Sequence, residues 1–112
     1  MNKDFLEFQK EFKKWQYKFG LTGYNVHFKY EPIDGAFASI SVNEMVATVR
    51  FNSKLDKDSE PFKDIERSAK HEAIHLLVHR LEQNARYRYS TEAEIYEAVE
   101  ELAYKLEELI KG

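Results

Sequence analysis

The sequence predicts a single α+β domain over residues 1–112. Three observations favour this fold class. Apolar residues recur at helical spacing near the N-terminus, three short segments in the middle alternate between apolar and polar residues, and the C-terminal half is again helical in pattern. Helices that flank a short run of strands pack against one face of a small sheet. A length of 112 residues suits one domain with a modest core.

Residues 4–19 are expected to form the first helix. Their aromatic residues recur at intervals of three and four, which places one apolar stripe along a helix: Phe5, Phe8, Phe12, Trp15 and Phe19. Gly20 follows directly, and glycine is a typical residue just beyond a helix end.

Three strands are expected next, at residues 24–30, 36–42 and 46–51, because apolar and polar residues alternate in each. A turn containing Pro32 and Gly35 separates the first two strands, and three residues separate the second from the third. Short connections join neighbouring antiparallel strands, so we expect a three-stranded antiparallel meander.

Two antiparallel helices complete the predicted fold. The first runs from about residue 60 to about residue 84, with Asp58 or Ser59 ahead of Pro61 as its start. Residues 86–90 form a connector. The last helix opens at Thr91, which has the form of a capping box with Glu94, and it runs to about residue 110.

The composition excludes several classes of protein. The net charge of −3 gives no reason to expect a nucleic-acid or anionic-membrane partner, and the lack of cysteine excludes disulfides and thiolate metal sites. No cleavable leader and no apolar stretch of membrane-spanning length is present, so we expect a cytoplasmic protein. Arg and Tyr alternate at residues 86–89, as in single-strand nucleic-acid binders, but four residues between two helices of an acidic protein are better explained by packing.

The most specific motif is H-E-x-x-H at residues 71–75, inside the long predicted helix. Histidines four residues apart stand one above the other on a helix, so His71 and His75 can reach one metal ion. Glu72 projects beside them, where it can accept a proton from a metal-activated water. The alternative is a polar helix face that holds no metal.

A hydrolytic zinc site needs a third protein ligand and an open position for water. His79 is one candidate, since it follows His75 by four residues. However, His71 and His79 lie roughly 12 Å apart along a straight helix, too far for three ligands in a row to converge on one tetrahedral ion.

The last helix offers acidic residues at positions 92, 94, 97, 100 and 101. An antiparallel return brings residues 97–101 level with His75, and places Glu92 and Glu94 too close to the connector to reach the histidines. On the helical wheel Glu100 falls on the same side of the helix pair as the histidines. Glu100 is therefore the predicted third ligand. Glu97 and Glu101 stay open, because a helix boundary can shift by a turn.

The sequence resembles the gluzincin branch of the zinc metallopeptidases, which carry H-E-x-x-H on one helix and a glutamate on a following helix. It is also similar to the very small zincin-like metallopeptidases of prokaryotes and their phages. Beyond the motif, the similarity is one of pattern, at Trp15, Gly20-Leu21-Thr22, Val26-His27-Phe28, Asp34-Gly35-Ala36-Phe37-Ala38, Val46-Ala47-Thr48-Val49 and Lys105-Leu106-Glu107. The larger gluzincins have an Asn-Glu signature at the third ligand and a C-terminal substrate subdomain, and this chain lacks both.

The resemblance implies Zn²⁺ at His71 and His75 with a glutamate of the last helix, Glu72 as general base, and a peptide or protein substrate. The expected function is that of a zinc-dependent metallopeptidase. The alternatives are a non-catalytic zincin-like domain, which uses the metal or cleft for stability or partner binding, and a hydrolase of non-peptide amides.

A tetrahedral oxyanion needs a further donor. The candidates are Tyr87, Tyr89, Tyr96, Tyr104 and His79, each of which has packing or solvent exposure as its simpler explanation. An extended peptide could add to an exposed edge of the sheet, although the sequence does not indicate which strand forms that edge. It does not indicate an oligomeric state either.

Overall fold

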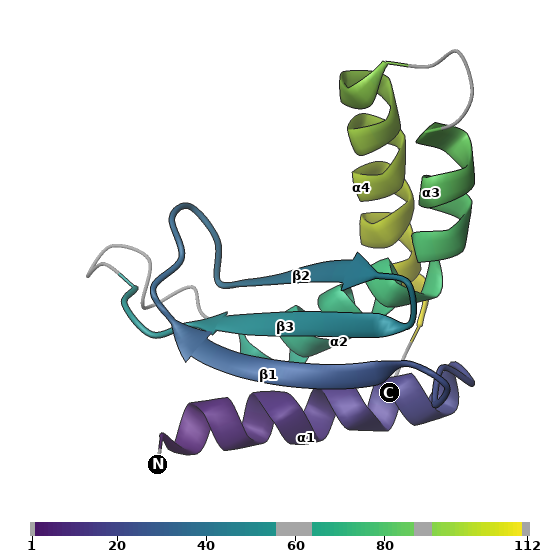
Figure 1. Cartoon of the computed structure of the whole chain (residues 1–112). Helices are drawn as coiled ribbons and strands as arrows, with labels where there is room; N and C mark the ends of the chain where they lie inside the picture. The colour runs from purple at the N-terminus through teal and green to yellow at the C-terminus, as the bar shows by residue number, and fades with distance from the viewer. Residues whose placement is uncertain (1, 56–63, 87–90, 111–112) are drawn as a thin grey trace.

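The computed structural model describes residues 2–55, 64–86 and 91–110. Along the chain the elements are α1 (Lys3–Lys18), β1 (Asn25–Glu31), β2 (Ala38–Asn43), β3 (Val46–Asn52), α2 (Ile65–Leu77), α3 (His79–Arg86) and α4 (Glu92–Leu109) (Figure 1). The predicted α+β class is therefore confirmed. Within the described residues, none of the helices combines the length and the apolar composition needed to span a membrane.

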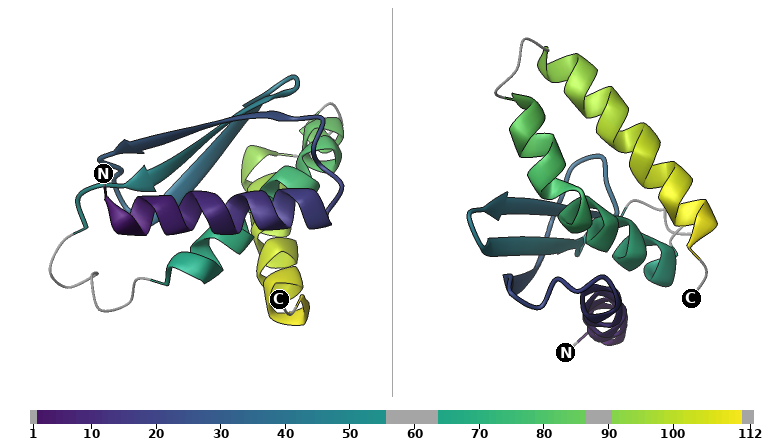
Figure 2. Two further views of the ribbon diagram at one scale, coloured as in Figure 1. Left: turned by 90° about the horizontal axis from the view of Figure 1, so that it is seen from below. Right: turned by 90° about the vertical axis from the view of Figure 1, so that its right-hand side faces the viewer.

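Helices α1 and α2 lie side by side against one face of the sheet (Figure 2). The core fills the space between these two helices and the sheet. The aromatic stripe of α1 supplies one side of this core, with Phe8 and Phe12 fully buried and Trp15 nearly so. Val49 of β3 and Ala73 of α2 are also fully buried and close the core from the other sides. The predicted first helix is confirmed, and Gly20 follows its end with a positive φ of 72°.

The sheet is mixed, so the predicted antiparallel meander is wrong. The strand order is β1-β3-β2, in which β3 pairs with β1 in parallel and with β2 antiparallel. Consecutive strands β1 and β2 are thus not neighbours. The six residues 32–37 between them can span two inter-strand spacings, about 10 Å, because extended chain covers about 3.3 Å per residue.

Asn52 explains why this connection crosses over the end of β3. Its side chain is buried at the C-terminal end of that strand, where its amide nitrogen donates to the carbonyl oxygens of Ile33 and Ala36 at 2.9 and 2.8 Å. Its amide oxygen accepts from the backbone N–H of Ile33 at 3.1 Å. The loop is therefore held across β3, which leaves the central position of the sheet for that strand.

The single long helix predicted for the second half of the chain is divided into α2 and α3. The backbone leaves helical geometry at Val78, where φ is −93° and ψ is 3°. Helix α2 packs against α1, β2 and α4, whereas α3 packs against α4. The break lets each part follow its own partner. Helix α2 begins at Ile65, and the predicted start near residues 58–61 lies outside the described residues.

Helix α4 returns antiparallel beside α2 and α3, as predicted, and its N-terminal half stands with α3 beyond the edge of the sheet (Figure 1). The predicted capping box is confirmed. The Thr91 hydroxyl accepts from the backbone N–H of Glu94 at 3.1 Å, and the Glu94 carboxylate accepts from the backbone N–H of Thr91 at 3.0 Å. This cap sets where α4 begins, and therefore which of its residues lie level with α2.

Candidate metal centre

His71 and His75 occupy adjacent turns of α2 and direct the same ring atom to one point. Their Nε2 atoms are 3.2 Å apart, and the two rings meet edge to face with centroids 4.8 Å apart. Both side chains are only about one-sixth exposed. The spacing of four residues therefore brings the two Nε2 atoms together, as the motif predicts.

Glu100 of α4 brings a carboxylate to the same point. Its Oε1 lies 3.2 Å from Nε2 of His75, and its Oε2 lies 3.6 Å from Nε2 of His71. Among the described residues, His71, His75 and Glu100 are the group of three or more potential ligands whose donor atoms all lie within 4.8 Å of one another.

The other acidic residues that the sequence analysis considered on the last helix lie away from the histidines or are engaged elsewhere. Glu94 is engaged in the capping box, Glu101 accepts from the Nζ of Lys105 at 2.7 Å, and Glu97 is exposed. Glu92 contacts Arg86. The structure thus brings Glu100, the preferred candidate, to the histidines.

The donor set fits a small tetrahedral cation. Zinc bonds of about 2.0–2.2 Å in tetrahedral geometry place two ligand atoms about 3.3–3.6 Å apart. This is close to the 3.2 Å between the two histidine Nε2 atoms and to the 3.2 Å between Nε2 of His75 and Oε1 of Glu100. In addition, Oε2 of Glu100 is enclosed and has no hydrogen-bond partner among the described residues. A buried carboxylate oxygen without a donor is costly, and a cation would offset that cost.

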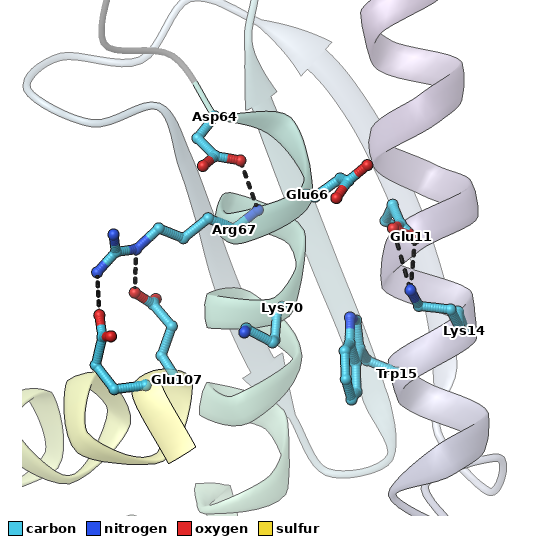
Figure 3. A pocket seen from close by; sticks show the side chains of 9 residues that line it. Glu11, Lys14, Trp15, Asp64, Glu66, Arg67, Lys70 and Glu107 are labelled. Atoms are coloured by element: carbon cyan, nitrogen blue, oxygen red, sulfur yellow. Dashed lines mark hydrogen bonds and ion pairs between the residues drawn. The ribbon is translucent and has the colours of Figure 1, made fainter. Parts of the chain in front are cut away.

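Glu107, two turns after Glu100 on α4, orients His71 from behind. Its side chain is buried, and Oε1 lies 2.9 Å from Nδ1 of His71. Arg67, one turn before His71, donates from Nε to the other oxygen of Glu107 and from a terminal nitrogen to Glu108 at 2.8 Å (Figure 3). A hydrogen on Nδ1 of His71 leaves the Nε2 lone pair free to bind a metal.

The contact between Glu107 and His71 was not predicted from the sequence. The signal that could have found it is periodicity, since Glu100 and Glu107 are seven residues apart and therefore share one face of a helix. Arg67 and His71 are likewise separated by one turn, on the helix opposite.

Glu72 lies next to the donor set but is not part of it. Its side chain is buried, and burial together with the nearby carboxylates of Glu100 and Glu107 raises the pKa of its carboxyl to about 8. Burial also lowers the pKa of His75, against the opposing attraction of Glu100. The site therefore favours the neutral, metal-binding form of this imidazole.

A cleft of about 960 Å³ opens in front of these residues, between β2, helices α2 and α3, and α4. One wall is the segment from Gly35 to Val42, which includes the edge strand β2. His79, Tyr96 and Tyr104 also line the cleft, and the Tyr104 ring packs against His71 with centroids 4.9 Å apart. Tyr87 and Tyr89 lie outside the described residues.

A smaller polar pocket of about 290 Å³ lies between α1 and α2 and extends to the C-terminal end of α4 (Figure 3). It shares Asp64, Arg67 and Glu107 with the cleft, and its lining holds no histidine. It is therefore separate from the donor set and touches it only through Glu107.

No protein-family model and no curated protein matches the chain. Among solved structures, the chain is similar to the crystal structure of the metallopeptidase zymogen jannalysin of Methanocaldococcus jannaschii, with 17% sequence identity and a TM-score of 0.45. The similarity covers 88% of this chain and 96% of that one. A likeness of this degree does not decide what the chain does, and the function proposed below rests on the geometry of the site.

Proposed function

We propose that the chain is a minimal zinc-dependent metallopeptidase. The observation that carries this proposal is the set of donor atoms from His71, His75 and Glu100, which have zinc-ligand spacing at the floor of an open cleft. In this proposal the three side chains hold the metal, and Glu107 keeps His71 in the tautomer that can bind it. The chemistry that zinc supplies when bound to three protein ligands is Lewis acidity, which lowers the pKa of water and polarises a carbonyl group.

Glu72 has the role of general base. Its carboxylate accepts a proton from the attacking water and returns it to the leaving nitrogen of the peptide bond. In the metal-free protein, burial and the nearby carboxylates raise the pKa of this carboxyl to about 8, so it holds a proton near neutral pH. A cation held by the donor set would favour the ionised form of Glu72, which is the form that accepts the proton from water.

The substrate is expected to lie along β2 as an added strand. β2 is an edge strand of the described sheet and forms one wall of the cleft, so its free main-chain groups can pair with an extended peptide. Tyr104 is the better placed of the two tyrosine donors because its ring packs on His71. Burial, together with the nearby carboxylate of Glu100, raises the pKa of its phenol, which therefore stays protonated and can donate a hydrogen bond.

The number of donors favours a catalytic over a purely structural metal site. Structural zinc is normally enclosed by four protein ligands, whereas a catalytic ion keeps one position open. In the part of the chain that the structure describes, three residues form the donor set, and His79 is not among them. This arrangement supports the enzyme rather than the non-catalytic zincin-like domain.

The first test is the zinc content of the purified protein by elemental analysis, with His75→Ala, Glu100→Ala and a matched Glu101→Ala control. We expect one zinc per chain in the wild type and in the control, and a loss of zinc in the other two variants. Zinc lost only with His75→Ala would remove Glu100 from the proposed site. A wild type that takes up no zinc even after reloading would contradict the proposal as a whole.

The second test separates the enzyme from a metal-binding domain without activity. Glu72→Gln keeps the size of the side chain but cannot accept the proton, so we expect normal zinc content and at least a hundredfold slower cleavage of a quenched fluorescent peptide library. Equal cleavage by wild type and variant would rule out Glu72 as the base. No cleavage by the zinc-loaded wild type would favour the non-catalytic domain.

A further inference from the structure

His79 is the first residue of α3, and its imidazole lies in the wall of the cleft. The Nε2 atom is enclosed and has no hydrogen-bond partner among residues 2–55, 64–86 and 91–110. Buried polar atoms are nearly always paired, since an unpaired one loses its hydrogen bonds to water without compensation. The imidazole itself lines the cleft, so a turn of the ring would bring this unpaired nitrogen to a group that enters the cleft.

Two charged residues of α3 that line the cleft with His79, Glu82 and Arg86, are paired with each other. Glu82, one turn beyond His79, accepts from Arg86 at 2.7 Å, and Arg86 also contacts Glu92. His79 is also not part of the donor set formed by His71, His75 and Glu100. Its free nitrogen thus serves neither an ion pair nor the candidate metal site.

The position of His79 suits a contact with an extended peptide. His79, Glu82, Gln83 and Arg86 follow the spacing of one helix face, and all four line the cleft, which β2 bounds with its own residues. His79 follows His75 by four residues, across the break at Val78, and both side chains line the cleft.

We infer that His79 is a substrate-binding residue, whose Nε2 forms a hydrogen bond with the main chain of a peptide to one side of the bond at the metal donors. This inference rests on the proposed function and deepens it, because it assigns α3 as a second binding wall beside the edge strand. A neutral imidazole can accept from a peptide N–H or donate to a peptide carbonyl, according to its tautomer.

The experiment compares three hydroxamates that share the same metal-binding group, with affinities measured by calorimetry on the zinc-loaded full-length protein. Acetohydroxamate reaches only the metal, acetyl-Ala-Leu-Ala-hydroxamate extends to one side of it, and a succinyl hydroxamate coupled to Leu-Ala-amide extends to the other. The variants are His79→Phe, which keeps a ring without the nitrogen, and His79→Gln, which keeps polar atoms. His27→Gln is the control, because His27 is exposed on β1.

For His79→Phe we expect about 3- to 10-fold weaker binding of one of the two peptide hydroxamates, the size of one lost hydrogen bond, with acetohydroxamate unchanged. His79→Gln should recover part of that affinity, and His27→Gln should match the wild type. Equal loss for all three probes, or loss for none, would overturn the assignment of His79 as a peptide-binding residue. The proposed metal site would still stand, because the wild type would bind zinc and acetohydroxamate. A wild type that binds neither zinc nor acetohydroxamate would instead remove the proposed function, and this inference with it.

Discussion

At the scale of single residues, Glu72 has the most strongly perturbed environment in the site. It directly follows His71 and is buried, so water stabilises its charge poorly, and the carboxylates of Glu100 and Glu107 repel that charge. The pKa of about 8 is the combined result. The protonated form of Glu72 is thus preferred by the zinc-free folded protein and not by the unfolded chain.

The stability of the zinc-free protein should therefore fall as the pH rises from about 4.5 to about 8, the ordinary and the raised pKa of Glu72. Within this range the folded state binds one proton more than the unfolded chain does. The resulting contribution to the free energy of unfolding is therefore complete below pH 4.5 and is lost above about pH 8. Urea unfolding at pH 5 and pH 9 measures the difference. Glu72→Gln should remove much of it, whereas Glu97→Gln, at an exposed position, should not. An unchanged pH dependence in Glu72→Gln would contradict the buried, protonated carboxyl.

Glu107 has a different role in the proposed site, because it contacts His71 and would act on a metal only through that histidine. Replacing it with Gln removes the negative charge that favours a hydrogen on Nδ1 of His71, and it leaves Arg67 with Glu108 as its remaining partner. We expect zinc affinity to fall about 10- to 100-fold in Glu107→Gln, as measured by competition with a chromophoric chelator. Glu108→Gln removes the neighbouring charge without touching His71 and is the matched control. If both variants bind zinc equally well, Glu107 does not orient the ligand.

At the scale of elements, the crossover between β1 and β2 decides the order of the sheet. The Asn52 side chain connects the loop to the end of β3 through the three contacts with Ile33 and Ala36, and it also accepts from the backbone N–H of Lys54 at 2.9 Å. This arrangement places β2, and not β3, at the edge that faces the cleft. The substrate wall of the proposed enzyme thus depends on one asparagine distant from the metal donors.

Asn52→Ala should lower the free energy of unfolding by roughly 2–4 kcal/mol, since several hydrogen bonds are lost and buried main-chain groups are left without partners. Asn25→Ala, at an exposed position at the start of β1, should change it by less than about 0.5 kcal/mol. Chemical denaturation of both variants measures the difference. A loss as small in Asn52→Ala as in the control would show that the loop is held by other contacts.

The division of the long helix at Val78 has its effect at the same scale. With the break, α2 keeps His71 and His75 against the sheet and the core, while α3 turns with α4 into the hairpin beyond the sheet. His79 therefore starts a new helix and lines the cleft without joining the donor set.

At the scale of the whole molecule, the donor set joins parts of the chain that are far apart in sequence. His71 and His75 belong to the helix that packs on the core, whereas Glu100 belongs to α4, which follows after α3 and residues 87–90. A metal ion held by all three therefore stabilises the packing of α4 on α2. The unfolded chain does not hold these ligands together, so binding of the proposed zinc ion would add directly to the stability of the fold.

Free zinc at about 100 times its dissociation constant should stabilise the folded state by about 2.7 kcal/mol and raise the melting temperature by roughly 10 °C. The rise should grow with zinc concentration, disappear with a chelator, and be lost in Glu100→Ala. Differential scanning calorimetry of zinc-loaded and zinc-free protein provides the measurement. A Glu100→Ala variant with the full zinc-dependent rise would show that α4 does not contribute a ligand.

The sequence by itself determined those features that depend on near neighbours along the chain. The aromatic stripe of α1, the capping box of Thr91 and Glu94, and the one-turn spacing of His71 and His75 follow from helical periodicity and from hydrogen bonds within four residues. The α+β class also follows, because it requires only the order of the elements.

Tertiary structure alone decided which distant segments meet. The position of β3 between β1 and β2, the break at Val78 and the contact of Glu107 with His71 have no local pattern that requires them. Helix depth and the helical wheel narrowed the choice of third ligand to Glu100, but α4 had to pack on α2 to bring its carboxylate to the histidines. The physical reason is common to all four: local sequence sets the direction of a side chain from its own backbone, whereas packing between elements sets which side chains it meets.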